Sequence, residues 1–392
     1  MSVIASNTYS ALNPENWKPA VQDYLNAMLV AKKICNVKCE AYLSSGDQVN
    51  FPYINDVRVQ NYTPGTELEI DSYTATQDSL IVNQSKAATA YIDPQEEKQA
   101  LADFGVSLAR QSAFQLSQNI DQAVISTGIT AAASTVTGGT LSAADMVALM
   151  SNVYAQLYRR NAMGSPMFAL IDPERTALLT QSFTANGFNI ADVTLRNGFR
   201  GMANDFNVYT TNNLPYAQSL TMDTQPTAAD TVTLAGVTWT FVASGTAANP
   251  GEISRGANLA AAQANLVNAI NGAGTHGAGT YIDVLVDDRR TYQNGQVTAT
   301  TFTVSNVMAV TAFGRISGAE TFTAGTNLWG TETGSLLFGT EGAISMAIQM
   351  QPELFVKEEP RMLGRNYITH TLHGEKVFTR DAQRLVKVTI NA

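Results

Sequence analysis

The first periodic pattern of apolar residues lies within residues 17–41. Its members recur every three or four positions, the spacing of one helix face: Val21, Leu25, Met28 and Leu29. The pattern predicts a helix that follows a polar start. Because residues 1–45 have no apolar core of their own, we expect them to form an N-terminal arm that lies against another surface.

In residues 46–92 the apolar residues occur at every second position instead, which is the spacing of a strand. They are Val49, Phe51 and Tyr53, then Val57 and Val59, then Leu68 and Ile70, then Leu80 and Val82. Pro52, Pro64 and Gly65 punctuate these runs. Strands with so little aliphatic bulk cannot bury a core alone, so the segment is predicted to be a projecting β-loop that needs a partner surface.

The clearest helix start in the sequence is Asp93-Pro94-Gln95-Glu96. It combines a capping side chain, a proline at the first helical position and a glutamate that can bond back to the cap. One apolar stripe continues from there to about Ile125: Leu101, Phe104, Leu108, Leu116, Ile120 and Val124. At about 1.5 Å per residue this helix would span roughly 50 Å, so we expect a spine along which other elements pack.

Helices and strands alternate in the next part of the chain. A linker rich in Gly, Ala, Ser and Thr at residues 127–140 leads to an amphipathic helix that Ser142 and Asp145 cap. A strand, a short helix and a second strand follow, at residues 167–171, 172–179 and 206–210. This alternation is typical of an α/β or α+β domain.

The composition changes at about Thr221, and from there to about Thr323 the chain has no lysine and is dominated by Thr, Ala and Gly. The predicted elements are a β-hairpin around Ala235-Gly236, a helix at residues 256–271 and strands at residues 281–286 and 298–310. Such a block indicates an inserted small α+β domain. Strands then resume at residues 336–338, 344–350, 367–372 and 385–390.

Composition and charge narrow the possible functions. Apolar residues make up 45% of the 392 positions and charged residues 15%, against roughly 25% charged in an ordinary soluble protein. This low charged fraction suits a chain whose surface is partly buried by neighbouring subunits. The net charge of -9 excludes a strongly basic nucleic-acid binder. No run approaches the roughly 18 apolar residues of a membrane span, and no secretory signal is visible, so we expect folding in the cytosol.

The sequence contains no convincing catalytic or metal-binding motif. The segment Gly272-Ala-Gly274-Thr-His-Gly277 has the letters of a dinucleotide fingerprint, but it follows a predicted helix and precedes a strand, the reverse of the required order. We interpret it as a flexible turn. His370, His373 and Glu375 lie in strand and turn, where residues three apart point to opposite faces, and we interpret them as a solvated strand end.

The two cysteines, Cys35 and Cys39, can build neither a disulfide scaffold nor a four-thiolate zinc site. They would lie one turn apart on the predicted N-terminal helix, and we interpret them as two small buried hydrophobes. We therefore expect no catalytic residues, no cofactor and no metal, and a protein that is not an enzyme.

Three segments carry a likeness to one known family. Residues 168–179 read as a strand and a helix that opens at Asp172-Pro173, residues 198–215 as a strand that runs into Asn and Pro, and residues 337–348 as the start of a C-terminal return. Together with the order of the parts, these segments resemble the major capsid proteins of tailed bacteriophages with the Hong Kong 97-type fold. The block after Thr221 resembles the insertion domain in coat proteins of some short-tailed phages.

The resemblance implies a fold class of α+β and a division into named parts. These are the N-terminal arm 1–45, the projecting extended loop 46–92, the spine helix and peripheral domain 93–135, the axial domain 136–220, the insertion domain 221–325 and the return to the axial and peripheral domain 326–392.

The function that the resemblance implies is that of a structural major capsid protein. Hexamers and pentamers of the chain would assemble in the host cytoplasm into the icosahedral capsid of a virion. The capsid would enclose packaged double-stranded DNA without sequence-specific binding, and no membrane would be involved. The chain has no long cleavable scaffold segment, so the expected partners include a separate scaffolding protein and a portal, with a decoration protein as an open alternative. Because the loop holds only Lys86, at its base, we expect no covalent cross-linking between subunits.

Three other functions stay open at this point. One is an encapsulin-like compartment with the same fold, and another is a phage tail or surface binding protein built on the Thr-rich block. The third is an ordinary α/β enzyme, for which the sequence offers no constellation of catalytic residues.

The charges of the projecting loop suggest where it docks. Between residues 47 and 78 there are six acidic residues, and Arg58 is the only basic one. We expect the loop tip, with Glu67, Glu69 and Asp71, to contact the basic peripheral region of an adjacent subunit. The candidate contacts there are Lys357, Arg361, Arg365, Arg380 and Arg384, together with Lys376. The alternative is an acidic loop that is simply solvated, since exposed ion pairs contribute only about 0 to 1 kcal/mol each.

Overall fold

The structure is a computed structural model, and it describes residues 30–43, 46–54, 58–70, 72, 75–92, 104–162, 166–185, 202–203, 205–285, 297–358 and 365–391. The chain divides into two compact units. Unit 1 comprises Met1–Ala133, Leu157–Phe168 and Gly339–Leu385, and unit 2 comprises Ser134–Gln156, Ala169–Phe338 and Val386–Ala392.

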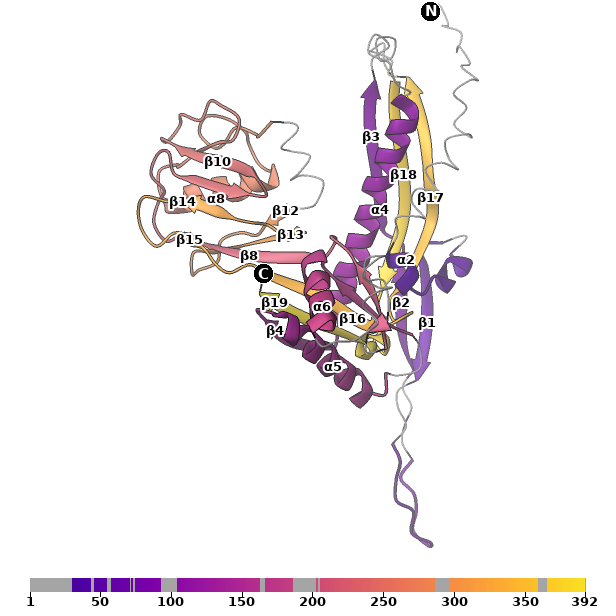
Figure 1. Ribbon diagram of the computed structural model, residues 1–392. Coiled ribbons are helices and arrows are strands. Elements are labelled where there is room, and N and C mark those ends of the chain that lie inside the picture. The colour runs from indigo at the N-terminus through magenta and orange to yellow at the C-terminus, as the bar shows by residue number, and fades with distance from the viewer. Residues whose placement is uncertain are drawn as a thin grey trace, which may run out of the picture. The chain divides into compact units, whose positions relative to one another are not determined.

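Unit 1 is built on a three-stranded antiparallel sheet in the order β17-β18-β3, with the long helix α4 along one face (Figure 1). The bounds are β3 Gln84–Ile92, α4 Phe104–Ala131, β17 Ser345–Glu358 and β18 Arg365–Lys376. Leu116, Ile120 and Val124 of the predicted stripe are buried, which confirms that part of the spine helix. Residues 93–103, including the predicted cap, lie outside the described residues.

Unit 1 also contains several smaller elements, of which η2 contacts β17, β2 contacts β18 and α2 contacts α4. They are α2 Ala31–Ile34, the 3-10 helix η2 Lys38–Tyr42, the hairpin strands β1 Gln48–Ile54 and β2 Ala75–Ile81, and the 3-10 helix η3 Asp381–Arg384. Cys39, Leu43, Leu80, Val82 and Ala347 form one buried apolar cluster there. The base of the β-loop therefore has a core, which it builds with the C-terminal strands.

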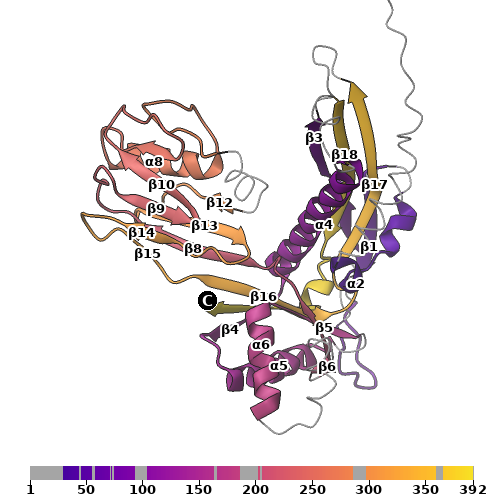
Figure 2. The same cartoon turned by 45° about the horizontal axis from the view of Figure 1, so that its top comes forward.

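Unit 2 contains most of a ten-stranded sheet with the main path β12-β13-β8-β16-β5-β7-β6, to which β15, β19 and β4 are joined (Figure 2). The bounds are β4 Ser134–Gly139, β5 Met167–Ile171, β6 Met202–Ala203, β7 Phe206–Thr210, β8 Pro215–Thr221, β12 Val297–Ala299, β13 Val307–Phe313, β15 Leu328–Trp329, β16 Thr333–Thr340 and β19 Leu385–Asn391. The helices α5 (Ala143–Arg159) and α6 (Pro173–Ala185) belong to the same region.

The caps that the sequence predicts for these helices are present. Ser142 donates its hydroxyl to Asp145 Oδ2 at 2.6 Å, and its backbone N–H bonds the same oxygen at 3.0 Å. Asp172 accepts the backbone N–H of Arg175 at 2.8 Å at the start of α6. Residues Met146, Leu149, Met150, Val153 and Leu157 are all buried, which confirms the apolar stripe of α5.

A second, four-stranded sheet in unit 2 has the order β11-β10-β9-β14. Its strands are β9 Thr231–Leu234, β10 Val237–Val242, β11 Glu252–Ser254 and β14 Ala319–Thr321, and the helix α8 Leu259–Asn271 lies beside it. The β9–β10 hairpin confirms the predicted turn at Ala235-Gly236, where both residues have positive φ. These elements fall within residues 221–325, but β12 and β13 of the same stretch join the larger sheet, so the limits of an insertion domain stay a prediction.

The structure corrects several local predictions. The expected linker at residues 127–140 is the end of α4 followed by β4, because β4 pairs in parallel with the distant β19. The strand expected at residues 281–286 is reduced, among described residues, to a bridge between Tyr281 and Ile253. The strand expected at residues 298–310 is two antiparallel strands, β12 and β13, joined by a turn.

In the described part of the predicted helix at residues 17–41, Ala31–Ile34 are helical, but the prediction is wrong beyond Ile34. The helix α2 ends at Ile34, and Cys35 is extended with ψ 154°. The Asn36 N–H bonds Ile344 O at 2.8 Å, and Asn36 O accepts the N–H of Met346 at 3.1 Å, so the chain here pairs with the start of β17. This pairing over a long sequence distance overrides the local helical spacing.

Candidate interaction site at the base of the β-loop

The base of the loop is the antiparallel hairpin β1–β2, whose register runs from Gln48 opposite Ile81 to Ile54 opposite Ala75. In β1 the more buried positions are Val49, Phe51 and Tyr53, as the alternation in the sequence predicts. Val49 and Phe51 pack against the apolar cluster of unit 1. The opposite face of β1 is exposed.

The hairpin is held to the loop that precedes η3 by an aromatic contact and by hydrogen bonds. The ring of Phe51 meets that of Phe378 edge-on, with centroids 5.1 Å apart. Asp78 accepts the N–H of Thr379 at 2.9 Å and its hydroxyl at 3.2 Å. The C-terminal segment therefore fixes the position of the hairpin within unit 1.

Arg380 adds a cationic contact to the same junction. Its Nη2 donates to Ile54 O at 2.7 Å, and its guanidinium carbon lies 5.7 Å from the centre of the Tyr53 ring. A cation over an aromatic face contributes about 0.5–1 kcal/mol when exposed. One predicted contact residue thus reaches the β-loop, but at the base of the loop of its own chain.

The chain passes very close to itself where β2 continues into β3. A Cβ added to Gly374 in β18 would lie 2.3 Å from Ile81 O and 2.9 Å from Val82 Cα, which no side chain can tolerate without a backbone shift. Only a glycine lets the two backbones pass here. This role could not be predicted from the sequence, because a glycine inside a strand has several explanations.

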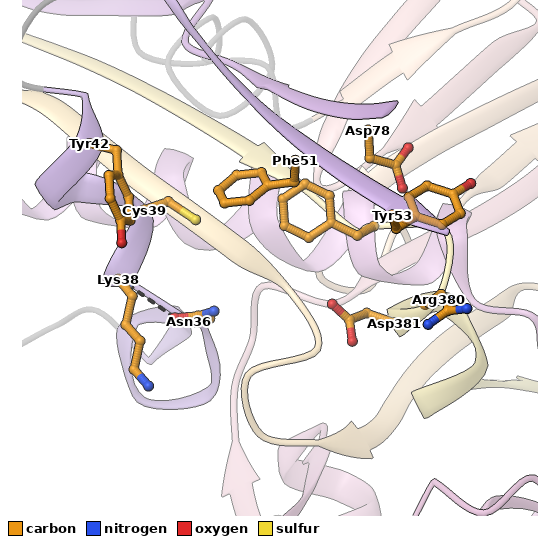
Figure 3. Close-up of a pocket in the computed structure, with 10 residues that line it drawn as sticks. Asn36, Lys38, Cys39, Tyr42, Phe51, Tyr53, Asp78, Arg380 and Asp381 are labelled. Atoms are coloured by element: carbon orange, nitrogen blue, oxygen red, sulfur yellow. Dashed lines mark hydrogen bonds between the residues drawn. The ribbon is translucent and has the colours of Figure 1, made fainter. Parts of the chain in front are cut away.

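A pocket of about 460 Å³ lies beside this junction (Figure 3). Its lining comes from the segment of η2, from the hairpin and from the loop before η3: Asn36, Lys38, Cys39, Tyr42, Phe51, Tyr53, Asp78, Phe378, Arg380 and Asp381. The aromatic rings and Cys39 supply an apolar lining, and Lys38 and Arg380 supply two cations. Asp78 and Asp381 supply two carboxylates, so the lining combines apolar walls with equal numbers of positive and negative side chains.

The described part of the loop tip, residues 58–70, turns at Pro64-Gly65. Gly65 has φ +87°, and Thr66 donates its N–H to Thr63 O at 3.1 Å, as in a turn of type II. Arg58 Nη2 lies 2.5 Å from Glu69 Oε2, and Gln60 Nε2 donates to Glu69 O at 2.9 Å, so the two arms are joined across the segment.

The same segment exposes large apolar side chains: Val59 at 94%, Tyr62 at 64%, Leu68 at 54% and Ile70 at 96% of their surface. Scattered exposed apolar residues are ordinary, but four within thirteen residues of one narrow segment indicate a surface that another molecule covers. This agrees with the expectation that the loop needs a partner surface.

The predicted contact residues are distributed over both the loop and the sheet. Glu67, Glu69 and Lys357 are exposed, and Arg365 begins β18. Asp71 and Arg361 lie outside the described residues. Arg384 bonds Thr340 Oγ1 at 2.6 Å and Asp381 Oδ1 at 3.2 Å within its own unit. Contact of these groups with an adjacent subunit stays a prediction.

The interpretation of His373 and Glu375 as a solvated strand end is wrong. His373 is fully buried, and the side chain of Glu375 is 8% exposed, with His373 Nε2 3.9 Å from Glu375 Oε2. Burial, and then the charge of Lys86, lowers the pKa of His373 to about 4, whereas burial raises the pKa of Glu375. Alternation along the strand could not reveal this burial, because both faces of β18 are partly covered.

The cysteines lie at the start of the same unit. Cys39 is buried, as predicted, and Cys35 is partly buried beyond the end of α2. Burial, followed by the negative charges of Asp121 and Glu375, raises the pKa of the Cys35 thiol. Asp121 also accepts the N–H groups of Val30 at 3.3 Å and of Ala31 at 3.1 Å, which ties α2 to α4.

The predicted turn at Gly272 is confirmed, since Gly272 ends α8 in the left-handed conformation. Within the residues that the structure describes, no group of three His, Cys, Asp or Glu side chains could hold a metal ion. No helix in the described part of the chain is both long and apolar enough to cross a membrane.

No family model matches the chain, and no curated protein matches it by sequence. A chain of the Mycobacterium phage Che8 structure matches with a TM-score of 0.55 and 12% identity, covering 92% of this chain and 90% of that chain. The capsid structure of cyanophage P-SCSP1u matches with a TM-score of 0.48 and 12% identity, covering 92% of this chain and 88% of that chain. A virus-like particle from Pyrococcus furiosus matches with a TM-score of 0.43 and 10% identity, covering 95% of this chain and 98% of that chain. The likeness to the Che8 chain shows that the two share a fold, and it confirms the predicted α+β, Hong Kong 97-type class.

Proposed function

We propose that this chain is the major capsid protein of a tailed bacteriophage, a structural protein that assembles into an icosahedral shell around packaged double-stranded DNA. The observation that carries the proposal is the shared fold with the Mycobacterium phage Che8 chain over 92% of this chain and 90% of that chain. A likeness over the whole length, rather than over one domain, favours a common architecture for the complete chain.

The exposed loop tip supports assembly as the mechanism. Twelve of the fifteen exposed large apolar residues among the described positions belong to unit 1, and four of those are in residues 58–70. Each such contact is modest alone, but it repeats in every subunit of a closed lattice. Repetition converts weak contacts into a stable particle through multivalency.

The net negative charge of the chain is consistent with a shell whose inner wall does not bind DNA tightly. With 33 acidic and 24 basic residues, the subunit lacks the cationic excess that phosphate binding needs. The proposed partners are further copies of the chain in hexamers and pentamers, a separate scaffolding protein, a portal and a decoration protein. The protein has no catalytic role in this proposal, and assembly takes place in the host cytoplasm.

In the shell, the acidic loop tip lies on the basic peripheral region of an adjacent subunit. The tip contributes Glu67, Glu69 and Asp71, and the receiving region contributes Lys357, Arg361, Arg365, Arg380 and Arg384. Arg380 and Arg384 already have partners in their own unit, so the exposed Lys357 is the first described cation to test. The exposure of Glu67 and Lys357 supports this arrangement.

Sedimentation of the purified protein, alone and with its scaffold, tests assembly. The expected result is capsomers or capsid-sized particles, and a monodisperse monomer at high concentration under both conditions contradicts the proposal. For the charge contact, replacing Glu67 and Glu69 by Gln and Asp71 by Asn should make particles more sensitive to urea at low salt. The difference should shrink at about 1 M salt, where the screening length is about 3 Å.

The matched control is Asp205→Asn, which removes one exposed carboxylate from unit 2 at a left-handed position that asparagine tolerates. It should leave the urea sensitivity unchanged. Equal stability of the amide variant and the parent at low salt would favour a solvated loop.

A further inference from the structure

Three side chains meet on one face of the three-stranded sheet of unit 1, each from a different strand. Met350 belongs to β17, His370 to the central strand β18 and Ser85 to β3 (Figure 1). His370 Nδ1 lies 3.0 Å from Met350 Sδ, and His370 Nε2 lies 2.8 Å from Ser85 Oγ. The imidazole ring therefore has one nitrogen beside a thioether and the other beside a hydroxyl.

The register of the sheet explains how one ring reaches both neighbouring strands. Leu372 is paired with Met350 on one side and with Ser85 on the other, and His370 precedes it by two residues on the same face of β18. Diagonal neighbours on adjacent strands are within reach of long side chains. The backbone pairing thus places both partners beside the imidazole.

The backbone of β17 is irregular at Met350. The pairing with β18 shifts register on both sides of this residue, between Ile348 and Met350 and between Met350 and Glu353. Pro352, which has no N–H to give to the ladder, falls in the second irregular stretch. Thr371 donates its hydroxyl to Met350 O at 3.1 Å, so a side chain holds this carbonyl. Bulges of this kind re-aim a side chain and are frequent beside functional sites.

The ring nitrogen that faces Met350 has a poor hydrogen-bond partner. A thioether is a weak acceptor, whereas the hydroxyl of Ser85 can accept a proton from Nε2 or donate one to it. When the proton of the neutral ring is on Nε2, Nδ1 and Sδ become two adjacent lone-pair donors. Met350 is 38% exposed and His370 is partly exposed, so an ion can reach both donors from solvent.

We propose that His370 Nδ1 and Met350 Sδ bind a soft monovalent metal ion, Cu(I) or its analogue Ag(I). A thioether is a soft ligand that selects Cu(I), and imidazole is a good copper ligand, whereas hard ions such as Mg²⁺ prefer carboxylates and water. The inference goes beyond the proposed function, because it concerns the single subunit. A bound ion would join β17 to β18 beside the irregular pairing.

Binding requires only small changes at the site. The proton of the neutral ring moves from Nδ1 to Nε2, and Nε2–H then donates to Ser85 Oγ, so no proton is released. A hydrogen bond from the second ring nitrogen is the usual way in which a metal-bound histidine is oriented. The two donors lie closer together than an ion between them requires, but the methionine side chain is unbranched and flexible, and the exposed Met350 can swing outward.

NMR of the histidine ring nitrogens tests the site, because the sequence has only three histidines. The full chain is kept as unassembled subunits, silver nitrate in a chloride-free buffer is the probe, and replacing each histidine by Gln assigns the signals. Ag(I) should shift the Nδ1 signal of His370 in a saturable way and leave Nε2 protonated. Cu(I), kept reduced, should compete for the same signal. The thiols of Cys35 and Cys39 also take up Ag(I), but they do not contribute to this signal.

Two variants and a matched control separate the roles of the side chains. Met350→Leu removes the sulfur, so silver should no longer shift the His370 signal at concentrations that saturate the parent chain. Ser85→Ala should weaken binding about tenfold, the usual effect of losing a hydrogen bond to a metal-bound histidine. His276→Gln, at a histidine that pairs with Asp283, should leave the His370 titration unchanged. Urea unfolding without silver checks that each variant is folded.

An unchanged His370 signal, at silver concentrations above those that saturate the two thiols, would overturn the proposal and leave an N–H···S hydrogen bond only. Equal titrations of Met350→Leu and the parent chain would also overturn it, because the imidazole would then bind the ion without the thioether. Neither result would bear on the proposed function, since the experiment uses unassembled subunits.

Discussion

Asp78 in β2 accepts two hydrogen bonds from Thr379, one from the backbone N–H and one from the hydroxyl, across 301 positions of the chain. This pair ties the base of the β-loop to the segment that precedes η3. Both residues are near the surface, so their two hydrogen bonds add to the apolar cluster around Leu80 in holding the hairpin on unit 1.

Asp78→Ala should therefore loosen the hairpin selectively. The substitution removes both acceptors for Thr379, and we expect a local loss of about 1–2 kcal/mol, because a typical hydrogen bond contributes about 0.5–1.5 kcal/mol. Amide hydrogen exchange should accelerate in residues 48–54 and 75–81 but not in α4. Gln77→Ala, on the same strand and exposed, should leave exchange unchanged. Uniform protection in Asp78→Ala would show that the apolar cluster alone holds the hairpin.

Gly374→Ala should disrupt the crossing of β18 and the β2–β3 connection. The new Cβ would lie 2.3 Å from Ile81 O, so the backbone must shift. We expect a loss of about 1–3 kcal/mol in the free energy of unfolding, as for other overpacked sites. Gly279→Ala is the matched control because its Cβ would meet nothing within 4 Å and its φ is not positive. Equal unfolding midpoints in urea for the two variants would contradict the close approach.

The buried ion pair in unit 2 gives a third prediction. Arg175 Nη1 lies 2.9 Å from Asp172 Oδ2, and Arg175 Nη2 donates to Asn391 O at 2.8 Å. Arg175→Met leaves the buried Asp172 carboxylate without its cation and should cost about 3–5 kcal/mol. Tyr216→Phe removes one hydrogen bond to the same carboxylate and should cost about 1–2 kcal/mol. Arg159 is exposed, so Arg159→Met should leave the free energy of unfolding almost unchanged. Similar losses for Arg159→Met and Arg175→Met in urea unfolding would contradict a buried ion pair between Arg175 and Asp172.

Acid stability should depend on His373. The unfolded histidine takes up a proton near pH 6.5, whereas the folded one does so only at about 4, so its contribution to stability falls as the pH falls through that window. The shift corresponds to about 3 kcal/mol by the usual conversion. Glu375 acts with the opposite sign: its raised pKa means that its contribution to stability falls as the pH rises above 4.5.

Substituting His373 isolates its part of the pH dependence. In His373→Gln the decline of the unfolding free energy between pH 6.5 and pH 4 should become shallower than in the parent chain. His370→Gln, a partly exposed position on the same strand, should keep the slope of the parent. Urea titrations at a series of pH values measure this, and parallel curves for the parent and His373→Gln would exclude a buried neutral histidine.

Local patterns in the sequence predicted the elements whose stability is local. The α5 stripe, the caps at Ser142 and Asp172, and the β9–β10 turn are all set by neighbours within a few residues, and each is confirmed. The alternation of Val49, Phe51 and Tyr53 likewise identified the inner face of β1.

Features that depend on distant pairing were not predictable in this way. The pairing of Asn36 with Ser345 ended the expected helix, and the pairing of β4 with β19 turned an expected linker into a strand. The candidate site shares this property. Its exposed acidic tip was visible as a run of charges, but the pocket joins residues 36–53, Asp78 and residues 378–381, which only the folded sheet brings together.

Electron microscopy of the purified, assembled protein in negative stain tests the central claim most directly. A capsid protein of this fold should give closed, roughly spherical shells of uniform diameter, or rings of subunits when the scaffold is withheld. Fibres, or small particles that stay monomeric at every protein concentration and with scaffold present, would contradict the account.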